Sequence, residues 1–191
     1  MDNSGSAALA DAIVSSEAEE LVLVDYRDAE IGHSTKARCH DGAGLLHRAF
    51  SLFVFNPDGH LLLQQRSAGK RLWPQYWANS CCSHPRRGET MDEAVHRRLH
   101  QELGITSKLA FLYKFVYHAS YGSTGSEYEY CWVYCGTTAD EVLANGNEVA
   151  DWRYLAPDTL DTELLYRPEL YTPWLKTEWA RIRTEYNHCV T

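Results

Sequence analysis

The chain lacks three features that would assign it to large classes of protein. It has no run of the roughly 18 apolar residues that a membrane-spanning helix needs, so we expect no membrane partner. It does not begin with a basic stretch followed by an apolar core, so no secretory signal is visible. Lysine and arginine number 18 against 26 acidic residues, a formal net charge of −8. This balance argues against nucleic acid as a partner, although a local cationic pocket could still bind a small anion.

The six cysteines occur without a secretory signal. That combination is typical of thiols in a reducing compartment and predicts a cytoplasmic protein without a disulfide framework. The chain has no internal repeat and no low-complexity segment, and its 191 residues with a 45% apolar share suffice for one core. We expect a flexible N-terminal arm over residues 1–19 and a single domain over residues 20–191. The sequence carries no signal for an oligomeric state.

The order of expected elements favours an α+β fold. Apolar and aromatic runs predict strands at 21–25, 48–55, 60–66, 108–119, 127–136 and 148–155. The turn Asn56–Gly59 predicts a β-hairpin, and the polar segment 33–44 reads as a loop. Helices are expected at 90–104, 157–165 and from Thr172 to about Tyr186. Mostly antiparallel strands with one inserted helix and later helices are typical of α+β proteins.

The segment Trp77–Gly104 concentrates reactive side chains and ends in the helix expected at 90–104, where Thr90 and Glu93 have capping-box spacing. Glu102 falls on the helix face that otherwise packs inward, with Arg98 one turn before it. One interpretation is an Arg98–Glu102 pair on a solvated edge. The other is a metal or phosphate site, which Cys82 and His84 in the preceding loop favour.

The strand expected at 127–136 alternates between two faces. Glu127 and Glu129 share a face with Cys131, Val133 and Cys135, which predicts two carboxylates pointing into the interior. Two buried acids this close would repel each other unless a cation lay between them. The alternative is a frayed strand end with solvated acids.

Several side chains have the chemistry of a metal and phosphate site. A divalent-ion cluster would comprise five imidazoles and carboxylates, a number that suits a six-coordinate ion better than tetrahedral zinc: His40, His47, His84, Glu127 and Glu129. Four cations could bind a diphosphate: Lys36, Arg66, Lys70 and Arg98. Glu102 could hold Mg²⁺ against phosphate oxygens, and Cys82 could be an acid/base group. Taken singly, the histidines could be surface residues, Arg66 and Lys70 solvated charges, and Cys82 an inert thiol.

Trp77–Gly104 resembles the Nudix segment of type 1 isopentenyl diphosphate isomerases. The resemblance extends from about Lys36 to Trp174 and includes WANSCCSHP, RRLHQELG, the EYE strand and the late TPW. Nudix hydrolases are expected to show G-x5-E-x7-R-E-U-x-E-E-x-G-U, where U is a bulky apolar residue. Glu89, Arg97 and Glu102 match that pattern, whereas Ser83, Arg98 and Gln101 replace its first glycine and two of its glutamates. Since metal-assisted hydrolysis needs those carboxylates, the departures fit the isomerases better.

The resemblance implies a Nudix-like fold, with a mixed and mostly antiparallel sheet flanked by helices. It implies interconversion of isopentenyl and dimethylallyl diphosphate, small-molecule substrates of isoprenoid biosynthesis, by a metal-dependent 1,3-proton shift. Cys82 and Glu129 would be the acid/base groups, with Tyr117 beside Glu129. Trp174 would lie over the isoprenoid carbons, where its π face can stabilise a cation.

The same resemblance implies the cofactors. The five-ligand cluster would hold Mn²⁺, Zn²⁺ or Mg²⁺, while Glu102 and the Cys82 backbone carbonyl would hold a second Mg²⁺ on the diphosphate. Nothing in the chain suggests a flavin. Two alternatives stay open: a Nudix-type diphosphate hydrolase, and a non-enzymatic, metal-stabilised binding domain.

Overall fold

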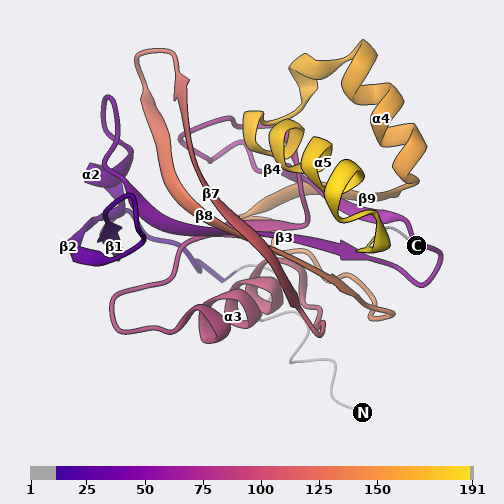
Figure 1. Cartoon of the computed structure of the whole chain (residues 1–191), viewed down its shortest axis with the longest axis horizontal. Helices are drawn as coiled ribbons and strands as arrows, with labels where there is room; N and C mark the ends of the chain where they lie inside the picture. Colours follow the sequence, from indigo (N-terminus) through magenta and orange to yellow (C-terminus); the bar gives the residue numbers. More distant parts are fainter. Residues whose placement is uncertain (1–11, 190–191) are drawn as a thin grey trace.

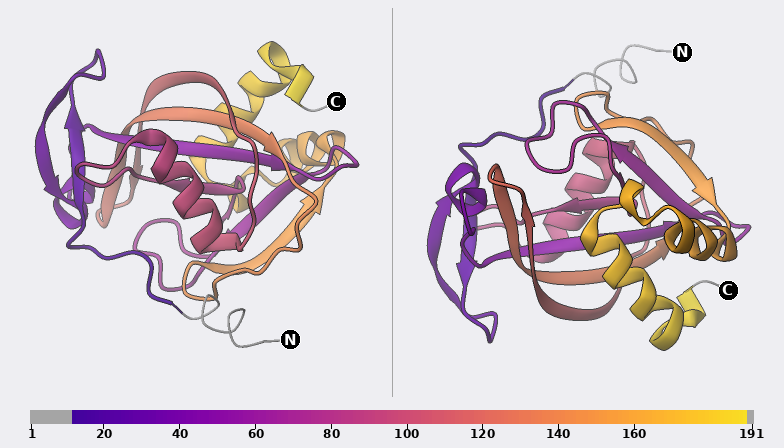
Figure 2. Two further views of the ribbon diagram at one scale, coloured as in Figure 1. Left: turned by 90° about the horizontal axis from the view of Figure 1, so that it is seen from below. Right: turned by 90° about the horizontal axis from the view of Figure 1, so that it is seen from above.

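The computed structural model describes residues 12–189, which form one mixed β-sheet with helices on both faces (Figures 1 and 2). The strands are β1 (Glu20–Val24), β2 (Glu30–Thr35), β3 (His47–Phe55), β4 (Leu61–Arg66), β5 (Trp77–Ala78), β6 (Cys81–Ser83), β7 (Ala110–Tyr121), β8 (Gly125–Thr137) and β9 (Val149–Leu155). The helices are α2 (Lys36–His40), α3 (Met91–Leu103), α4 (Pro157–Tyr166) and α5 (Pro173–Glu185), with short 3-10 turns η1 (Pro168–Leu170) and η2 (Asn187–Cys189). The expected α+β class is confirmed.

Strand β3 organises the sheet. It pairs antiparallel with β1, β4 and β6, and parallel with β8. Strand β8 continues antiparallel into β7, and β9 lies antiparallel to β4. The hairpin expected around Asn56–Gly59 is confirmed by the pairing of Phe55 with Leu61.

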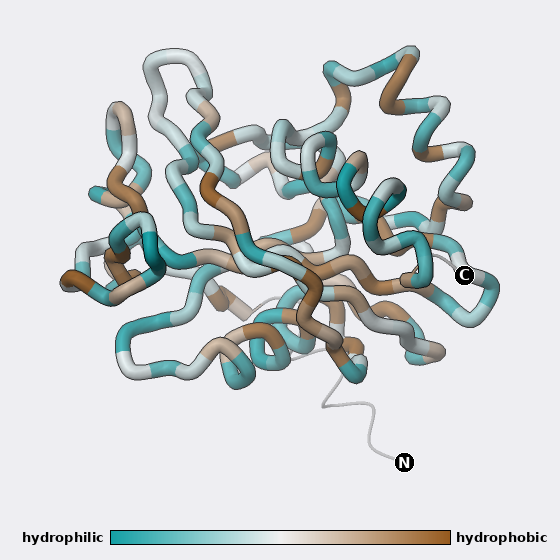
Figure 3. Tube along the Cα trace, viewed as in Figure 1, coloured by the Kyte–Doolittle hydropathy of each residue, from teal (hydrophilic) through white to brown (hydrophobic). Residues whose placement is uncertain are grey.

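Helices cover both faces of β3, which explains its nearly continuous apolar sequence. Phe50, Leu52 and Val54 pack in the core layer under α3. Phe53 and Phe55 point the other way, into the core layer shared with α4 and α5. The hydropathy colouring in Figure 3 shows brown, apolar residues along the second half of β3, and more teal, hydrophilic residues on the helices. No helix in residues 12–189 is both long and apolar enough to cross a bilayer.

Helix α3 begins and ends as its sequence predicts. Thr90 and Glu93 form the reciprocal capping box, and Gly104 ends the helix with a left-handed φ of 68°. Leu99 is fully buried on the inward face. The position of α3 therefore follows directly from its capping residues and its apolar period.

Among the strands and α-helices, four were not predicted: β2, α2, β5 and β6. The prediction of a loop at 33–44 is wrong. This segment completes β2 and then forms the five-residue helix α2, which is capped by Thr35. A helix this short has too few turns to display an apolar period. Strands β5 and β6 have only two and three residues, too few for a visible alternation. Residues 1–11 of the expected N-terminal arm lie outside the described residues.

Candidate active site

The register of three strands gathers most of the candidate side chains. In the parallel β3–β8 ladder, His47 lies beside Glu129, and in the β7–β8 ladder Tyr117 lies on the other side of Glu129. Neighbours across a ladder share a face of the sheet, so these three side chains converge. Further along β3, Ser51 pairs with Cys82 on β6. The start of β3 thus lies next to each part of the site.

Helix α2 brings His40 to the same place. A Cβ on Gly125 would lie 2.2 Å from the carbonyl oxygen of His40, so only glycine lets α2 approach the start of β8 this closely. At that separation the His40 Nε2 lies 2.8 Å from Glu127 Oε2. Gly125 therefore sets the distance between an imidazole of α2 and a carboxylate of β8.

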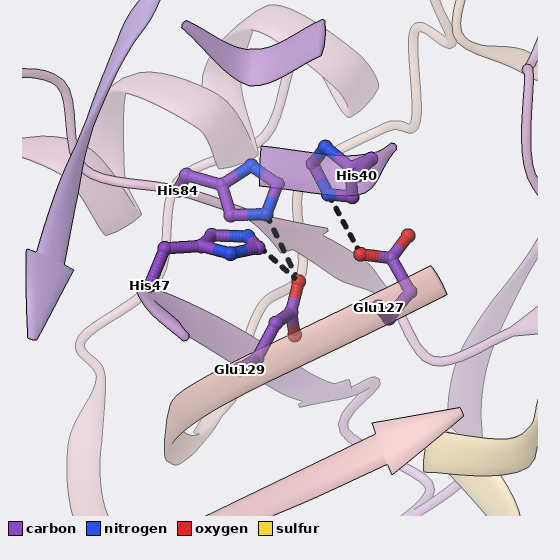
Figure 4. Close-up of side chains that lie close together, drawn as sticks. All are labelled: His40, His47, His84, Glu127 and Glu129. Carbon is purple, nitrogen blue, oxygen red and sulfur yellow. Dashed lines mark hydrogen bonds and ion pairs between the residues drawn. The ribbon is translucent and has the colours of Figure 1, made fainter. Parts of the chain in front are cut away.

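Five potential metal ligands meet at this point, as Figure 4 shows. One ligating atom each from His40, His47, His84, Glu127 and Glu129 lies within 4.8 Å of all the others. The His84 Nε2 lies 2.9 Å from Glu129 Oε1, and the His47 Nε2 lies 3.8 Å from the same oxygen. The frayed-end alternative for β8 is wrong, since both carboxylates are buried.

Two of the three histidines, His40 and His47, are oriented as metal ligands usually are. The Nδ1 of His40 lies 2.8 Å from the carbonyl oxygen of Lys36, and the Nδ1 of His47 lies 2.7 Å from that of Leu45. If each Nδ1 donates its proton to that carbonyl, Nε2 keeps a lone pair directed into the cluster. The His47 Nε2 is buried and has no hydrogen-bond partner among residues 12–189. A buried, unpaired acceptor is costly, and a cation in the cluster would satisfy it.

Burial and mutual repulsion set the protonation of the cluster. Burial, reinforced by the neighbouring His40, lowers the pKa of His47 to about 4, and burial also lowers the pKa of His84. Both rings are therefore neutral at pH 7, the form that binds metals. Burial and the charge of Glu127 raise the pKa of Glu129 well above its usual value. Glu129 is thus the carboxyl group of the pair that most readily holds a proton.

Cys82 is held by three polar groups beside this cluster. Its Sγ donates to Asn79 Oδ1 at 2.7 Å, accepts from the Trp174 Nε1–H at 3.1 Å and lies 3.6 Å from Ser51 Oγ. Burial, followed by the charge of Glu178, raises the pKa of this thiol well above its usual value. Cys82 also lines the same cavity as Tyr117 and Glu129.

The cavity has a volume of about 370 Å³, within the range of small-ligand sites. All four predicted cations line it: Lys36, Arg66, Lys70 and Arg98. Burial and the positive charge of Lys70 lower the pKa of Lys36. The two ammonium groups therefore lie close enough to repel each other. The solvated-charge interpretation of Arg66 and Lys70 is wrong. Lys36, Lys70 and Arg98 lie together and form the cationic end of the cavity. Arg66 lies over the Trp174 ring, close to the Cys82 thiol.

The sequence of this chain is similar to that of one protein family. A model of the NUDIX domain matches residues 45–175. Isopentenyl-diphosphate Delta-isomerase 2 of Photorhabdus laumondii is 44% identical over 158 residues, which cover 83% of this chain and 89% of the relative. Isopentenyl-diphosphate Delta-isomerase of Halorhodospira halophila is 40% identical over 160 residues, covering 83% and 91%. The chain belongs to the isopentenyl-diphosphate Delta-isomerase family of Nudix proteins.

Solved structures confirm the expected fold. DR0079 from Deinococcus radiodurans superposes with a TM-score of 0.70 at 23% identity, covering 85% of this chain and 98% of that one. A MutT protein from Methanosarcina mazei gives 0.62 at 17% identity, covering 74% and 95%. At these identities the likeness concerns the Nudix fold alone.

The altered Nudix helix α3 forms two ion pairs. Arg97 bonds Glu89, with its Nη2 2.8 Å from Oε2, and so ties the loop before α3 to the helix. Arg98 pairs with Glu102, and both side chains are almost fully buried, so the expectation of a solvated edge is wrong. Glu102 also accepts from Gln64 Nε2 at 3.1 Å.

Sequence reasoning missed two polar residues of the site, Asn79 and Glu148. Glu148 pairs with Lys70, and its Oε2 lies 3.3 Å from Arg98. These two cations outweigh burial and lower the pKa of Glu148 to about 2. In the sequence, the one feature of Glu148 that could have marked it as a site residue was its position at the start of an expected strand. Asn79 follows the two-residue strand β5, where the sequence shows no periodicity.

The described part of the N-terminal arm contacts the cationic end of the cavity. The Val14 carbonyl accepts from Arg98 Nη1 at 2.8 Å, and Ser15 Oγ accepts from Lys36 Nζ at 2.5 Å. Residues that precede β1 therefore lie against side chains proposed to bind the substrate.

Proposed function

We propose that the protein is an isopentenyl-diphosphate Delta-isomerase, which interconverts isopentenyl diphosphate and dimethylallyl diphosphate. The observation that carries this proposal is one cavity that joins Cys82 and Glu129 to four cations, in a chain 44% identical to one isomerase of that name and 40% identical to another. The free state of all six cysteines supports a cytoplasmic location, where thiols stay reduced.

The cations would bind the diphosphate of the substrate. Arg66 and Arg98 offer fixed guanidinium groups, while Lys36 and Lys70 add point charges. Lys70 and Arg98 now contact Glu148, so the incoming phosphate oxygens would share or replace that carboxylate. Glu102 does not line the cavity in this structure and is paired with Arg98, which does. It would have to turn from Arg98 toward the cavity to hold, together with the Cys82 backbone carbonyl, a Mg²⁺ ion on the diphosphate. That ion would supply positive charge where the anionic oxygens of the diphosphate meet Glu102 and Glu148.

His40, His47, His84, Glu127 and Glu129 would hold the second ion, Mn²⁺, Zn²⁺ or Mg²⁺. Their donor set of three imidazoles and two carboxylates suits a divalent ion with more than four ligands. When bound, the ion supplies charge that stabilises two adjacent buried carboxylates. No flavin is needed for this chemistry.

The reaction itself is a proton shift along three carbons. A proton added to the terminal alkene carbon leaves a tertiary cation, and loss of a proton from C2 gives the dimethylallyl product. Glu129 and Cys82 would be the two proton carriers. The Tyr117 hydroxyl donates to Glu129 Oε2 at 2.5 Å and would hold that carboxyl group in place. The Trp174 ring would face the cationic carbons.

The direct test is incubation of the purified protein with isopentenyl diphosphate and Mg²⁺. Dimethylallyl diphosphate is the expected product. Release of phosphate or pyrophosphate without that product would instead indicate a Nudix hydrolase.

Two substitutions test the assigned roles. C82A and E129Q should each lower turnover by at least about 100-fold, the usual contribution of a general acid or base, while the protein stays folded. C135A is the matched control, because the Cys135 thiol packs in the core layer shared with α4 and α5, beside Cys189, and its turnover should be normal. Normal turnover in C82A would refute the acid/base assignment. Absence of turnover in the wild-type protein, with metal binding that C82A leaves intact, would instead favour a binding domain.

A further inference from the structure

Helix α5 directs two polar side chains, one turn apart, toward the active-site face of the sheet. Trp174 contacts the Cys82 sulfur through its indole N–H. Glu178, four residues later, is completely buried and has no part in the function proposed for the cavity. Within residues 12–189 no lysine or arginine forms an ion pair with it, and its Oε2 has no hydrogen-bond partner. A buried acid without a cation is costly, so the protein retains it at an energetic disadvantage.

A short series of polar contacts connects Glu178 to Cys82. The Glu178 Oε1 lies 3.5 Å from Cys131 Sγ, which lies 3.5 Å from Ser51 Oγ. Ser51 Oγ in turn lies 3.6 Å from Cys82 Sγ. The strand register explains the geometry, since Ser51 on β3 lies opposite Cys82 on β6, and Cys131 follows Glu129 on the inward face of β8. Ser51 is the last contact before Cys82 in this series.

The protonation of Glu178 decides which way these hydrogen bonds point. Burial raises its pKa to about 8, although hydrogen bonds from Ser51 and Cys131 oppose the rise. A neutral carboxyl group has an O–H to donate, whereas a carboxylate only accepts. If Glu178 donates its proton, either to Ser51 directly or through Cys131, then the Ser51 hydroxyl is left to donate to the Cys82 sulfur. A carboxylate would reverse this order and remove the Ser51 donor from Cys82.

We propose that Glu178 is a positioning residue whose uncharged carboxyl group, acting through Cys131 and Ser51, fixes the hydrogen bonds received by the Cys82 sulfur. The sulfur then accepts from Ser51 and from Trp174 and keeps Asn79 as its acceptor. This orientation would prepare Cys82 to exchange a proton with the substrate. The inference rests on the acid/base role proposed for Cys82.

Two variants separate hydrogen bonding from charge and packing. E178Q preserves the shape and the donor of a neutral acid, whereas E178L has a similar volume and no polar group. We expect E178Q to keep kcat within about twofold, and E178L to lower kcat about tenfold with unchanged KM, the scale of one or two hydrogen bonds. Thermal unfolding verifies the fold, and E178M replaces E178L if the latter does not fold. Equal losses of kcat in both variants, or full kcat in E178L, would overturn the proposal.

A double-mutant cycle with S51A tests the route through Ser51. The E178L/S51A enzyme should be no slower than S51A alone, because the contact to Cys82 is already broken. Independent, multiplicative losses would contradict a route through Ser51.

The alkylation rate of Cys82 gives a readout that does not depend on turnover. Iodoacetamide labelling, followed by mass spectrometry of the Cys82 peptide, should be about fivefold slower in E178L than in wild type or E178Q, since Ser51 is no longer held as a donor to the sulfur. Equal labelling rates in all three proteins would overturn the inference. If C82A retained turnover, the function proposed for Cys82 would fail, but the labelling rates would still decide whether Glu178 acts on this sulfur.

Discussion

Arg98 neutralises two buried carboxylates, which makes R98M a sensitive test of the cationic end of the cavity. Its side chain is 3% exposed and contacts both Glu102 and Glu148, which are 2% and 4% exposed. Removing one partner of such a buried group lowers the free energy of unfolding by about 3 to 5 kcal/mol, because the charge that remains is buried without a partner. A domain of this size has a free energy of unfolding of about 5 to 15 kcal/mol, so R98M should lose a large fraction of it.

The neighbouring Arg97 provides the matched control. It lies in the same helix and pairs with Glu89, but both side chains are partly exposed to solvent, so R97M should cost only about 1 kcal/mol. Urea unfolding of both variants can be followed by tryptophan fluorescence, since the chain has six tryptophans. Adding E102Q to R98M should restore part of the loss, because Glu102 is the carboxylate left without a cation, whereas Glu148 keeps its pair with Lys70. A cost of R98M no greater than that of R97M would refute this account of the buried charges.

Three further outcomes are expected. Lys70 and Arg98, outweighing burial, lower the pKa of Glu148 from 4.5 to about 2, so Glu148 contributes stability above pH 4.5 that disappears as the pH falls through about 2. The difference in free energy of unfolding between wild type and E148Q should therefore be largest above pH 5 and shrink toward pH 2. A difference that does not change with pH, measured by urea unfolding, would contradict that sign. W174F keeps an aromatic ring against Trp73 but removes the N–H that contacts the Cys82 sulfur. The kcat of W174F should therefore fall about tenfold. An unchanged kcat would show that this hydrogen bond does not contribute to turnover. H84A should lower the metal content of the purified protein in elemental analysis, whereas H33A, at a histidine paired only with Glu30 outside the cluster, should not. Equal metal content in both variants would count against a five-ligand site.

The parts of the site that sequence could predict are those that depend on local periodicity. The alternation of β8 placed Glu127 and Glu129 on the inward face together with Cys131, and the burial of each residue confirms it. The capping box and apolar period of α3 fixed the helix that carries Arg98 and Glu102. Each of these features lies within one strand or helix, so residues close together in the sequence are enough to predict it.

The missed features depend on contacts between distant segments. His40 was expected in the cluster, but the helix that carries it was not: the loop expected at 33–44 contains α2, which packs against Gly125 at the start of β8. Glu148 acquires its role only where the start of β9 meets Lys70 and Arg98. Glu178 lies on the same face of α5 as Trp174, but nothing in its neighbours shows that Cys131 and Ser51 will face it. Arg98 and Glu102 were expected as a pair, while their burial depends on layers that sequence alone does not place.

The central claim is that one cation is surrounded by His40, His47, His84, Glu127 and Glu129, beside the sulfur of Cys82. The most direct test is anomalous diffraction from crystals grown with Mn²⁺ and measured at the manganese edge. A single strong peak should lie within about 2.0 to 2.3 Å of the three imidazole nitrogens and the two carboxylates. A map without a peak among those five side chains, or with the metal bound elsewhere, would contradict the claim.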